Sequence, residues 1–182
     1  MKFSIVIPTR GERSESLDIC VESIKKYTTD YELIIINNEG MGLNSKINRG
    51  ILASTGEYIV LLHDDVTVHE GWLDEVAAVG CFRVMEQNDI FECWGGIGGG
   101  FCTDPKLSPD YSAFILLSRT ALMDIGLTDP FYEEPGWQDT DYGQQVRAAG
   151  FKIKCLSGTI THRALNQTLA PENKVHYDEK WS

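Results

Sequence analysis

The sequence is poor in positive charge and lacks any long apolar run. Lys and Arg number 16 against 27 Asp and Glu, which gives a formal net charge of −11. This balance disfavours nucleic acid as a partner, because binding to a phosphate backbone depends on clustered cations. It also disfavours charge-driven docking on anionic lipid. No stretch approaches the ~20 apolar residues of a membrane-spanning helix, so we expect no membrane span.

The cysteines lack a C-x-x-C pair, and their number, five, is odd. Scattered cysteines of this kind are typical of packing thiols in a reducing compartment. The N-terminal stretch "MKFSIVIPTR" has only a short apolar run before Pro8. This run is too short for a signal peptide, and we therefore expect a cytoplasmic protein.

Repeats, linkers and low-complexity segments are also missing. The 182 residues are 42% hydrophobic and 24% charged, as in an ordinary globular protein. A chain of this length can build one domain with a substantial core. We expect a single domain over residues 1–182, with a C-terminal tail from about 164 to 182.

The first third of the chain alternates between strand and helix patterns. Continuous apolar runs at residues 2–9, 31–38 and 57–65 favour buried strands, and helical spacing of apolar residues connects them at 14–27 and 45–54. Apolar strands joined by helices predict an α/β fold with a mostly parallel central sheet and helices on both faces.

The rest of the chain continues the alternation around a glycine-rich stretch. The five glycines within Gly95–Gly100 do not form G-x-G-x-x-G between a strand and a helix, so a dinucleotide-binding turn is a poor match. The stretch is either a flexible loop beside a site or a simple connector. The further elements that we expect are helices at 72–87, 119–126 and up to Gly150, and strands at 89–94, 111–118, 152–156 and 158–162.

Polar residues follow each of the three first strands. They are Pro8-Thr9-Arg10, Asn37-Asn38-Glu39 and His63-Asp64-Asp65. In parallel sheets, ligands bind beyond the carboxyl ends of the strands. The adjacent carboxylates of Asp64 and Asp65 are therefore either part of a solvated turn or a site for Mg²⁺ or Mn²⁺, which prefer oxygen ligands.

Three more residues, in the C-terminal half of the chain, are candidates for catalysis or metal binding. Asp139 and Asp141 precede a helical stretch, where an acid either complements the helix N-terminus or acts as a general base. His162 ends the last predicted strand and is either structural or a metal ligand. The residues alone leave these alternatives open.

The order of these groups resembles the family 2 glycosyltransferases, which are inverting nucleotide-sugar enzymes of the GT-A fold. "FSIVIPTR", "ELIIINNEG" and "NRGILASTGEYIVLLHDD" are similar to the family's first strand, its base-binding loop and its Asp-Asp motif. "GWQDTDYGQQVRAAGF" is similar to the segment with the catalytic acid. The resemblance extends from Lys2 to about Arg163, and the closing "HYDEKW" resembles the tails of small members.

The resemblance implies a GT-A domain that uses Mn²⁺ or Mg²⁺ and transfers a sugar, with inversion, from a nucleoside-diphosphate sugar to an unknown acceptor hydroxyl. Asp139 matches the general base, and Asp65 and His162 match the metal ligands. Asp64 would contact the ribose or support Asp65, and Trp137 would wall the acceptor side. The residues expected to bind the nucleotide sugar are Pro8, Thr9, Arg10, Asn37, Asn38, Asn48, Asp64 and Trp137.

The sequence departs from the family pattern in three ways. Asn37 and Asn38 replace an acid that accepts a hydrogen bond from the N–H of the base. The resemblance favours a UDP-sugar as donor, but an amide both donates and accepts hydrogen bonds, so the identity of the base stays open. His63 replaces a third aspartate. Gln138 replaces a glutamate, which removes a like charge beside Asp139 and favours its ionisation.

Two other functions are alternatives that the sequence leaves open. A non-catalytic nucleotide-sugar binder would account for the departures at Asn37 and His63. A sugar-nucleotide pyrophosphorylase shares the architecture but needs a basic, glycine-rich loop after the first strand, and "PTRGERSES" contains one glycine.

Overall fold

The computed structural model describes residues 2–11, 14–73, 114–151, 160–162 and 170–182. Its main sheet has four strands in the order β2-β1-β3-β5. The strands are β1 (Phe3–Pro8), β2 (Tyr31–Ile36), β3 (Tyr58–Leu62) and β5 (Phe114–Ser118). β1 pairs in parallel with β2 and β3, whereas β5 pairs antiparallel with β3. The sheet is therefore mostly parallel, as the sequence predicts.

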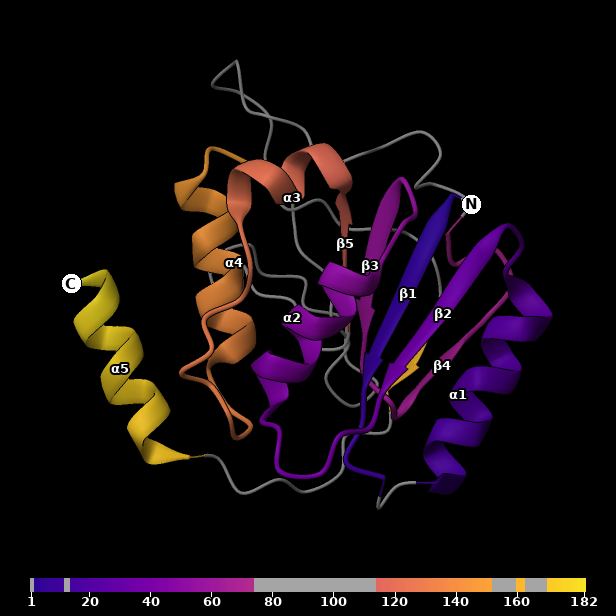
Figure 1. Ribbon diagram of the computed structural model, residues 1–182, viewed down its shortest axis with the longest axis horizontal. Coiled ribbons are helices and arrows are strands. Elements are labelled where there is room, and N and C mark those ends of the chain that lie inside the picture. The colour runs from indigo at the N-terminus through magenta and orange to yellow at the C-terminus, as the bar shows by residue number, and fades with distance from the viewer. Residues whose placement is uncertain (1, 12–13, 74–113, 152–159, 163–169) are drawn as a thin grey trace.

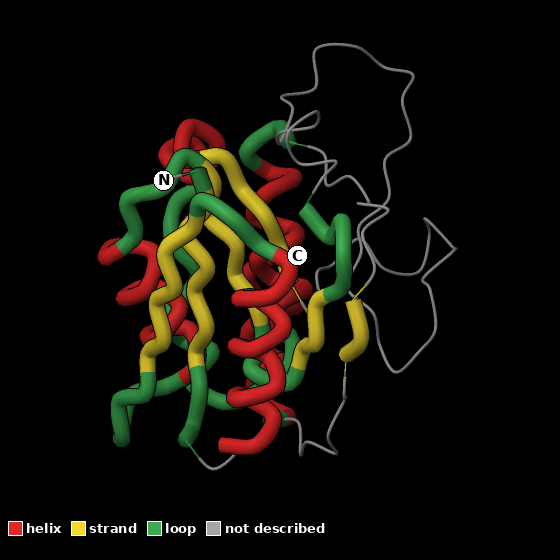
Figure 2. Tube along the Cα trace, turned by 90° about the vertical axis from the view of Figure 1, so that its right-hand side faces the viewer, coloured by secondary structure: helices red, strands yellow, loops and turns green. Residues whose placement is uncertain are grey.

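The apolar runs form strands because both faces of the sheet are covered, which Figure 2 shows from the side. On one face, Ile5 and Ile7 of β1 pack with Cys20 and Ile24 of α1 (Ser14–Tyr27). The other face is covered by three helices, α2 (Leu43–Ala53), α3 (Arg119–Ile125) and α4 (Gln138–Ala148), which share a core with Val6 of β1.

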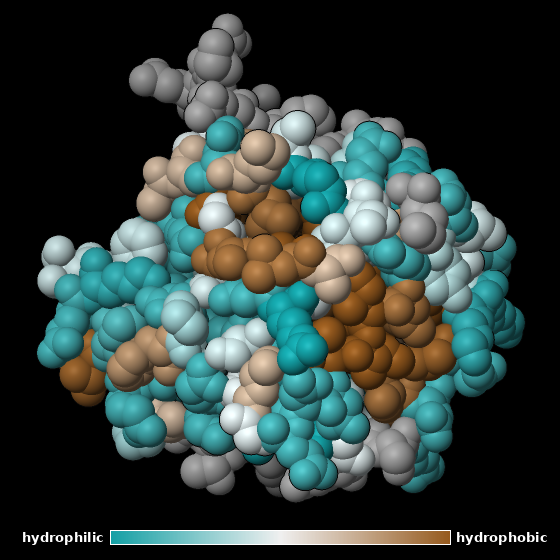
Figure 3. Space-filling view, viewed as in Figure 1, coloured by the Kyte–Doolittle hydropathy of each residue, from teal (hydrophilic) through white to brown (hydrophobic). Residues whose placement is uncertain are grey.

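The outer strand β2 is only partly covered. Its residues are half-buried, and Ile35 is 39% exposed. The face seen in Figure 3 is mainly hydrophilic but has an apolar area over this strand.

A second, two-stranded sheet lies next to the end of β3. β4 (Val66–Val68) pairs antiparallel with β6 (Ile160–His162). β4 is attached to α1, because the Val68 N–H donates to the Ser23 hydroxyl at 3.1 Å. Trp72, which follows β4, is buried and donates its indole N–H to the Thr28 hydroxyl at 3.0 Å. The sequence predicts neither β4 as a separate strand nor this pairing.

The end of the sheet opposite to the polar loops is closed by Glu32. Its carboxylate accepts hydrogen bonds from the Ser4 hydroxyl and from the backbone of Thr55 and Gly56. A Cβ on Gly56 would lie 2.6 Å from the Ser4 hydroxyl oxygen, so this close approach needs glycine.

The helix α5 (Pro171–Trp181) packs on the outer side of α4 (Figure 1). The sequence predicts a tail here and no helix. Within the described residues, no helix combines the length and the hydropathy needed to cross a membrane. The helix expected at 72–87, the strands at 89–94 and 152–156 and the loop Gly95–Gly100 lie wholly or almost wholly outside the described residues.

Candidate active site

The loops at the carboxyl ends of the parallel strands and the first turn of α4 lie at the same end of the molecule (Figure 1). Two contacts connect them. The Arg10 guanidinium binds Glu134 at 2.7 Å, across 124 residues of sequence. The backbone N–H of Leu43, at the start of α2, donates to the Glu133 carbonyl at 2.9 Å. The segment before α4 therefore contacts both the end of β1 and the start of α2.

The loop after β1 is held against the end of β2. The Thr9 N–H donates to the Ile36 carbonyl at 3.1 Å, and the Thr9 hydroxyl accepts from the Gly11 N–H. Gly11 has φ +78°, and a Cβ there would lie 3.0 Å from the Asn37 amide nitrogen. The Asn37 side chain thus lies directly against the loop that begins with Pro8.

The neighbouring candidates differ in exposure. Thr9 is buried, Asn38 is half-buried, and Arg10 and Asn37 are exposed. The structure brings Pro8, Thr9, Arg10 and Asn37 together at the carboxyl ends of β1 and β2, and we call this group of residues the rim.

Lys46 also belongs to this rim, although the sequence does not predict it. It is 6% exposed, and its ammonium group donates to the Thr9 carbonyl at 2.9 Å. Burying an ammonium group is costly unless it is hydrogen-bonded or paired with an anion. Lys46 therefore places a positive charge at the backbone of the β1 loop. In the sequence, a lysine within a short amphipathic helix gives no sign of this burial.

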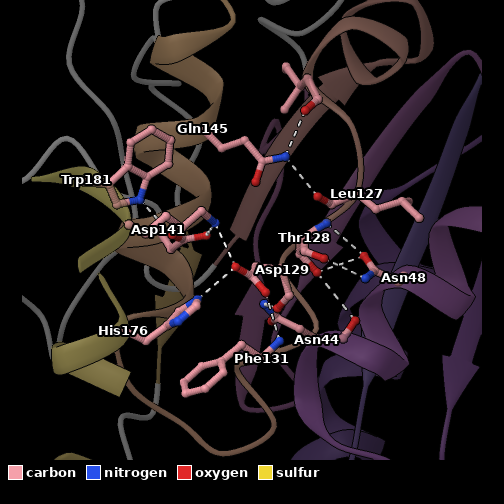
Figure 4. A network of polar contacts seen from close by, with 12 residues as sticks. Asn44, Asn48, Leu127, Thr128, Asp129, Phe131, Asp141, Gln145, His176 and Trp181 are labelled. Carbon is pink, nitrogen blue, oxygen red and sulfur yellow. Dashed lines mark hydrogen bonds and ion pairs between the residues drawn. The ribbon is translucent and has the colours of Figure 1, made fainter. Parts of the chain in front are cut away.

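Asn48 lies in the same helix but is engaged elsewhere. Its amide nitrogen donates to the Thr128 carbonyl at 2.7 Å, and its amide oxygen accepts from the Thr128 N–H and hydroxyl (Figure 4). Asn44 similarly donates to the Asp129 carbonyl. These bonds use both ends of the Asn48 amide to hold the segment between α3 and α4.

The two aspartates after β3 form the turn between β3 and β4. Asp64 is 6% exposed and Asp65 is 2% exposed, so this turn is not a solvated one. The Cys20 thiol lies beside them and donates to the His63 carbonyl at 3.8 Å. Burial, followed by the charges of Asp64 and Asp65, raises the pKa of this thiol to about 12. The turn places two buried carboxylates next to each other, and oxygen ligands of this kind suit a divalent cation.

His162 approaches this turn through its backbone. It is paired with Val66, the residue after Asp65, in the sheet of β4 and β6. Its side chain lies outside the described part of the structure. Among the described residues, no cluster of three or more His, Cys, Asp and Glu side chains is arranged to hold a metal.

The turn before α4 has an unusual backbone. Trp137 has φ +66°, a left-handed conformation that side-chain-bearing residues seldom adopt. Gln138 stabilises the turn, because its side-chain oxygen accepts from the Gly136 N–H at 2.6 Å. Asp139 follows in the first helical turn, half-buried, with one carboxylate oxygen 2.9 Å from the Thr140 N–H.

Asp141 lies two residues further and has a different environment. Its side chain is 1% exposed. One oxygen accepts from the Lys180 ammonium group at 2.8 Å, and the other accepts from the Trp181 indole N–H at 2.8 Å (Figure 4). Lys180 also binds Asp129 at 2.9 Å. Asp141 thus anchors α5 on α4, whereas Asp139 remains partly accessible.

Asp129 completes this network and gives it a pH dependence. Burial alone would raise its pKa, but hydrogen bonds from His176, Lys180 and the Phe131 N–H hold the pKa at about 2, against an ordinary value of 3.8. The stabilisation from this lowered pKa is present above pH 3.8 and is lost as the pH falls toward 2.

We expect Asp129→Asn to remove this component, which amounts to about 2 kcal/mol from the size of the pKa shift. Urea unfolding of both proteins at several pH values measures it. The stability advantage of the parent over the variant should shrink by this amount between pH 5 and pH 2. An advantage that stays constant over this range would contradict the assignment.

The described fold is that of the GT-A glycosyltransferases. No family model matches the sequence, and no curated protein does. Among solved structures, the chain is similar to the catalytic domain of Drosophila β1,4-galactosyltransferase 7 in complex with xylobiose, with a TM-score of 0.68 and 15% identity over 97% of this chain and 79% of that one.

Two further structures have the same fold. S. aureus TarS in complex with UDP-GlcNAc has a TM-score of 0.65 at 14% identity and covers 97% of this chain and 64% of that one. GalNAc-T7 with UDP, GalNAc and Mn²⁺ has a TM-score of 0.67 at 15% identity and covers 99% of this chain and 48% of that one. At these identities the similarity establishes the fold alone.

Proposed function

We propose that this protein is an inverting, metal-dependent glycosyltransferase related to family 2, which transfers a sugar from a nucleoside-diphosphate sugar to an acceptor hydroxyl. One observation carries the proposal. The buried turn Asp64-Asp65, the loop with Thr9 and the first turn of α4 with the half-buried Asp139 lie at the same end of the central sheet, where the parallel strands end. Structures with this fold contain Mn²⁺ with UDP-Gal, or UDP-GlcNAc, which favours a UDP-sugar as donor.

A divalent cation fits the residues of the turn. Carboxylate oxygens are the ligands that Mn²⁺ and Mg²⁺ prefer, and two carboxylates are buried here. Asp65 and His162 would hold the cation, with Asp64 supporting Asp65 or contacting the ribose. When bound, the cation supplies a Lewis acid for the diphosphate leaving group.

The nucleotide would lie on the rim of the β1 loop. Asn37 and Asn38 would hydrogen-bond the base, and Lys46 would place its positive charge close to the bound nucleotide. The ion pair of Arg10 with Glu134 is exposed, with side chains 51% and 64% accessible, and such pairs contribute little. The Arg10 guanidinium is therefore available to an incoming phosphate. Asn48 would act indirectly, by holding the segment that precedes α4.

Asp139 would act as the general base. As the acceptor oxygen bonds to the anomeric carbon from the side opposite to the diphosphate, the bond to the diphosphate breaks and the hydroxyl proton moves to the Asp139 carboxylate. The positive end of the α4 dipole favours the ionised form of an acid in its first turn. The engagement of Asp141 with Lys180 and Trp181 supports the choice of Asp139.

Calorimetry of UDP binding, with and without Mn²⁺, tests the donor and metal assignments together. We expect Mn²⁺ to increase UDP affinity in the parent, and Asp65→Asn to abolish this increase. Lys46→Met should lower UDP affinity by ~10-fold under both conditions, because it removes a positive charge close to the diphosphate, an effect of about 1.4 kcal/mol.

Lys25→Met serves as the control, because Lys25 is exposed and its ammonium group pairs with Glu22 on α1. It should leave UDP affinity unchanged. Release of UDP from UDP-Gal or UDP-GlcNAc then distinguishes an enzyme from a binder. Metal-dependent binding with no turnover would favour the non-catalytic alternative, and no binding of UDP would contradict the proposal.

A further inference from the structure

Helix α5 contacts the backbone that leads into the turn before α4, at Trp137. Asn173 is 2% exposed, and its side-chain amide donates to the carbonyls of Glu134 and Gly136, at 3.0 and 2.8 Å. These carbonyls lie on either side of Pro135, whose own carbonyl accepts from the Ala170 N–H at 3.2 Å. Three consecutive carbonyls before Trp137 are therefore bound by the start of α5.

The same helix also packs on the side chain of Trp137. The Tyr177 ring lies 5.2 Å from the Trp137 ring, and the Lys174 ammonium group lies 5.1 Å from the centre of that ring. A left-handed conformation at a residue with a side chain is unfavourable and persists only where its surroundings enforce it. Here the surroundings of Trp137 are provided in part by α5.

Beyond Trp137, α5 holds the chain again at Asp141. Lys180 and Trp181 bind the two oxygens of this carboxylate, as described above. Asp139 lies between the two points of attachment, two residues after Trp137 and two before Asp141. The backbone angles of Trp137 set the direction in which α4 begins, and with it the position of Asp139.

We propose that α5 is a positioning element of the active site, in which Asn173 fixes the backbone before Trp137 and thereby places the Asp139 carboxylate. The proposal rests on the proposed function for its effect on catalysis. It gives the C-terminal helix a role beyond covering α4: the bonds of Ala170 and Asn173 go to the three carbonyls before Trp137, and those of Lys180 and Trp181 go to Asp141, so we expect the helix to act mainly on the base.

A positioning role and a purely structural role differ in their kinetics. Misplacement of a catalytic group by about 1 Å can lower a rate by ~10²-fold. Loss of Asn173 should therefore lower kcat for UDP release from a UDP-sugar by ~10- to 100-fold and leave the donor KM within about threefold of the parent. A general loss of folded protein would also lower the apparent kcat, so each rate is divided by the concentration of UDP-binding sites, which calorimetry measures.

The test compares Asn173→Ala with Val175→Ala in the full chain. Val175 lies on the same helix and is 57% exposed, so its replacement should change nothing. Hydrogen exchange of the amides of residues 136–142 is measured alongside the kinetics, with UDP-Gal and UDP-GlcNAc as donors and Mn²⁺ present. We expect faster exchange of these amides in Asn173→Ala, together with the fall in kcat.

The possible outcomes separate this proposal from the proposed function. Faster exchange with an unchanged kcat, or an equal loss in both variants, would overturn the positioning role. If the parent releases no UDP, the proposed function fails, and unchanged exchange in Asn173→Ala would then overturn the positioning role independently. Should Asn173→Ala fail to fold, Tyr177→Leu removes the ring that packs on Trp137 and is subject to the same two criteria.

Discussion

Replacement of Asp139 by asparagine is expected to lower sugar transfer by about 10²- to 10⁴-fold, the usual contribution of a positioned general base. The amide has the shape of the carboxylate and can still accept the Thr140 N–H through its oxygen. It cannot take up the proton of the acceptor hydroxyl. Because Asp139 is half-buried, stability and UDP affinity should remain close to those of the parent.

Glu134→Gln provides the matched control for Asp139→Asn. Glu134 is an exposed acid in the same segment, and its carboxylate pairs with Arg10. Neutralising it removes the same unit of charge close to the site without removing the base. UDP release from the donor sugar, measured for both variants, checks the prediction. Transfer by Asp139→Asn at the rate of the parent would exclude Asp139 as the base.

Replacement of Lys180 by methionine is expected to give the largest loss of stability. The Lys180 ammonium group lies between Asp129 and Asp141, and the Asp141 side chain is 1% exposed. Removal of one partner of a buried ion pair leaves an uncompensated charge and costs about 3–5 kcal/mol. We expect about 3 kcal/mol, since the Trp181 indole N–H still binds Asp141 and Lys180 itself is 26% exposed.

Lys174→Met tests whether this loss is specific to the buried position. Lys174 lies on the same helix and pairs with Asp178, with side chains 53% and 56% exposed. Exposed pairs of this kind contribute at most about 1 kcal/mol. Urea unfolding measures both variants, and the double variant Lys180→Met/Asp141→Asn should recover part of the loss. Equal stabilities of the two single variants would contradict the described network.

The elements that are marked by an apolar pattern within their own sequence could be predicted. The apolar run of β1 forms a strand buried on both faces, and Leu17, Cys20 and Ile24 mark the face of α1 that packs on it. Gly126 ends α3 with φ +87°, where glycine is favoured. The placement of polar loops at the ends of the parallel strands follows from the topology of the sheet, and it is what locates the candidate site.

Features that depend on long-range polar contacts could not be predicted. The α5 sequence "PENKVHYDEKW" has no apolar stripe, because the helix is held by hydrogen bonds and ion pairs to Asp129, Glu134, Gly136 and Asp141. The burial of Lys46 depends on the Thr9 carbonyl, 37 residues away. By residue type and position alone Asp139 and Asp141 are equivalent, and the prediction of Asp139 as the base comes from the family resemblance. In the structure, the contacts of Lys180 and Trp181 with Asp141 distinguish the two acids.

A crystal structure of the protein with UDP and Mn²⁺ tests the central claim most directly. The claim is that a cation site after β3 and a proton acceptor at the start of α4 face a single bound nucleotide sugar. The expected result is anomalous density for Mn²⁺ at Asp65 and His162, with the diphosphate bound to the Mn²⁺. The Asp139 carboxylate should face the β-phosphate across the space that the donor sugar would occupy. Mn²⁺ and UDP bound away from Asp65, or an Asp139 side chain directed away from the nucleotide, would contradict the account.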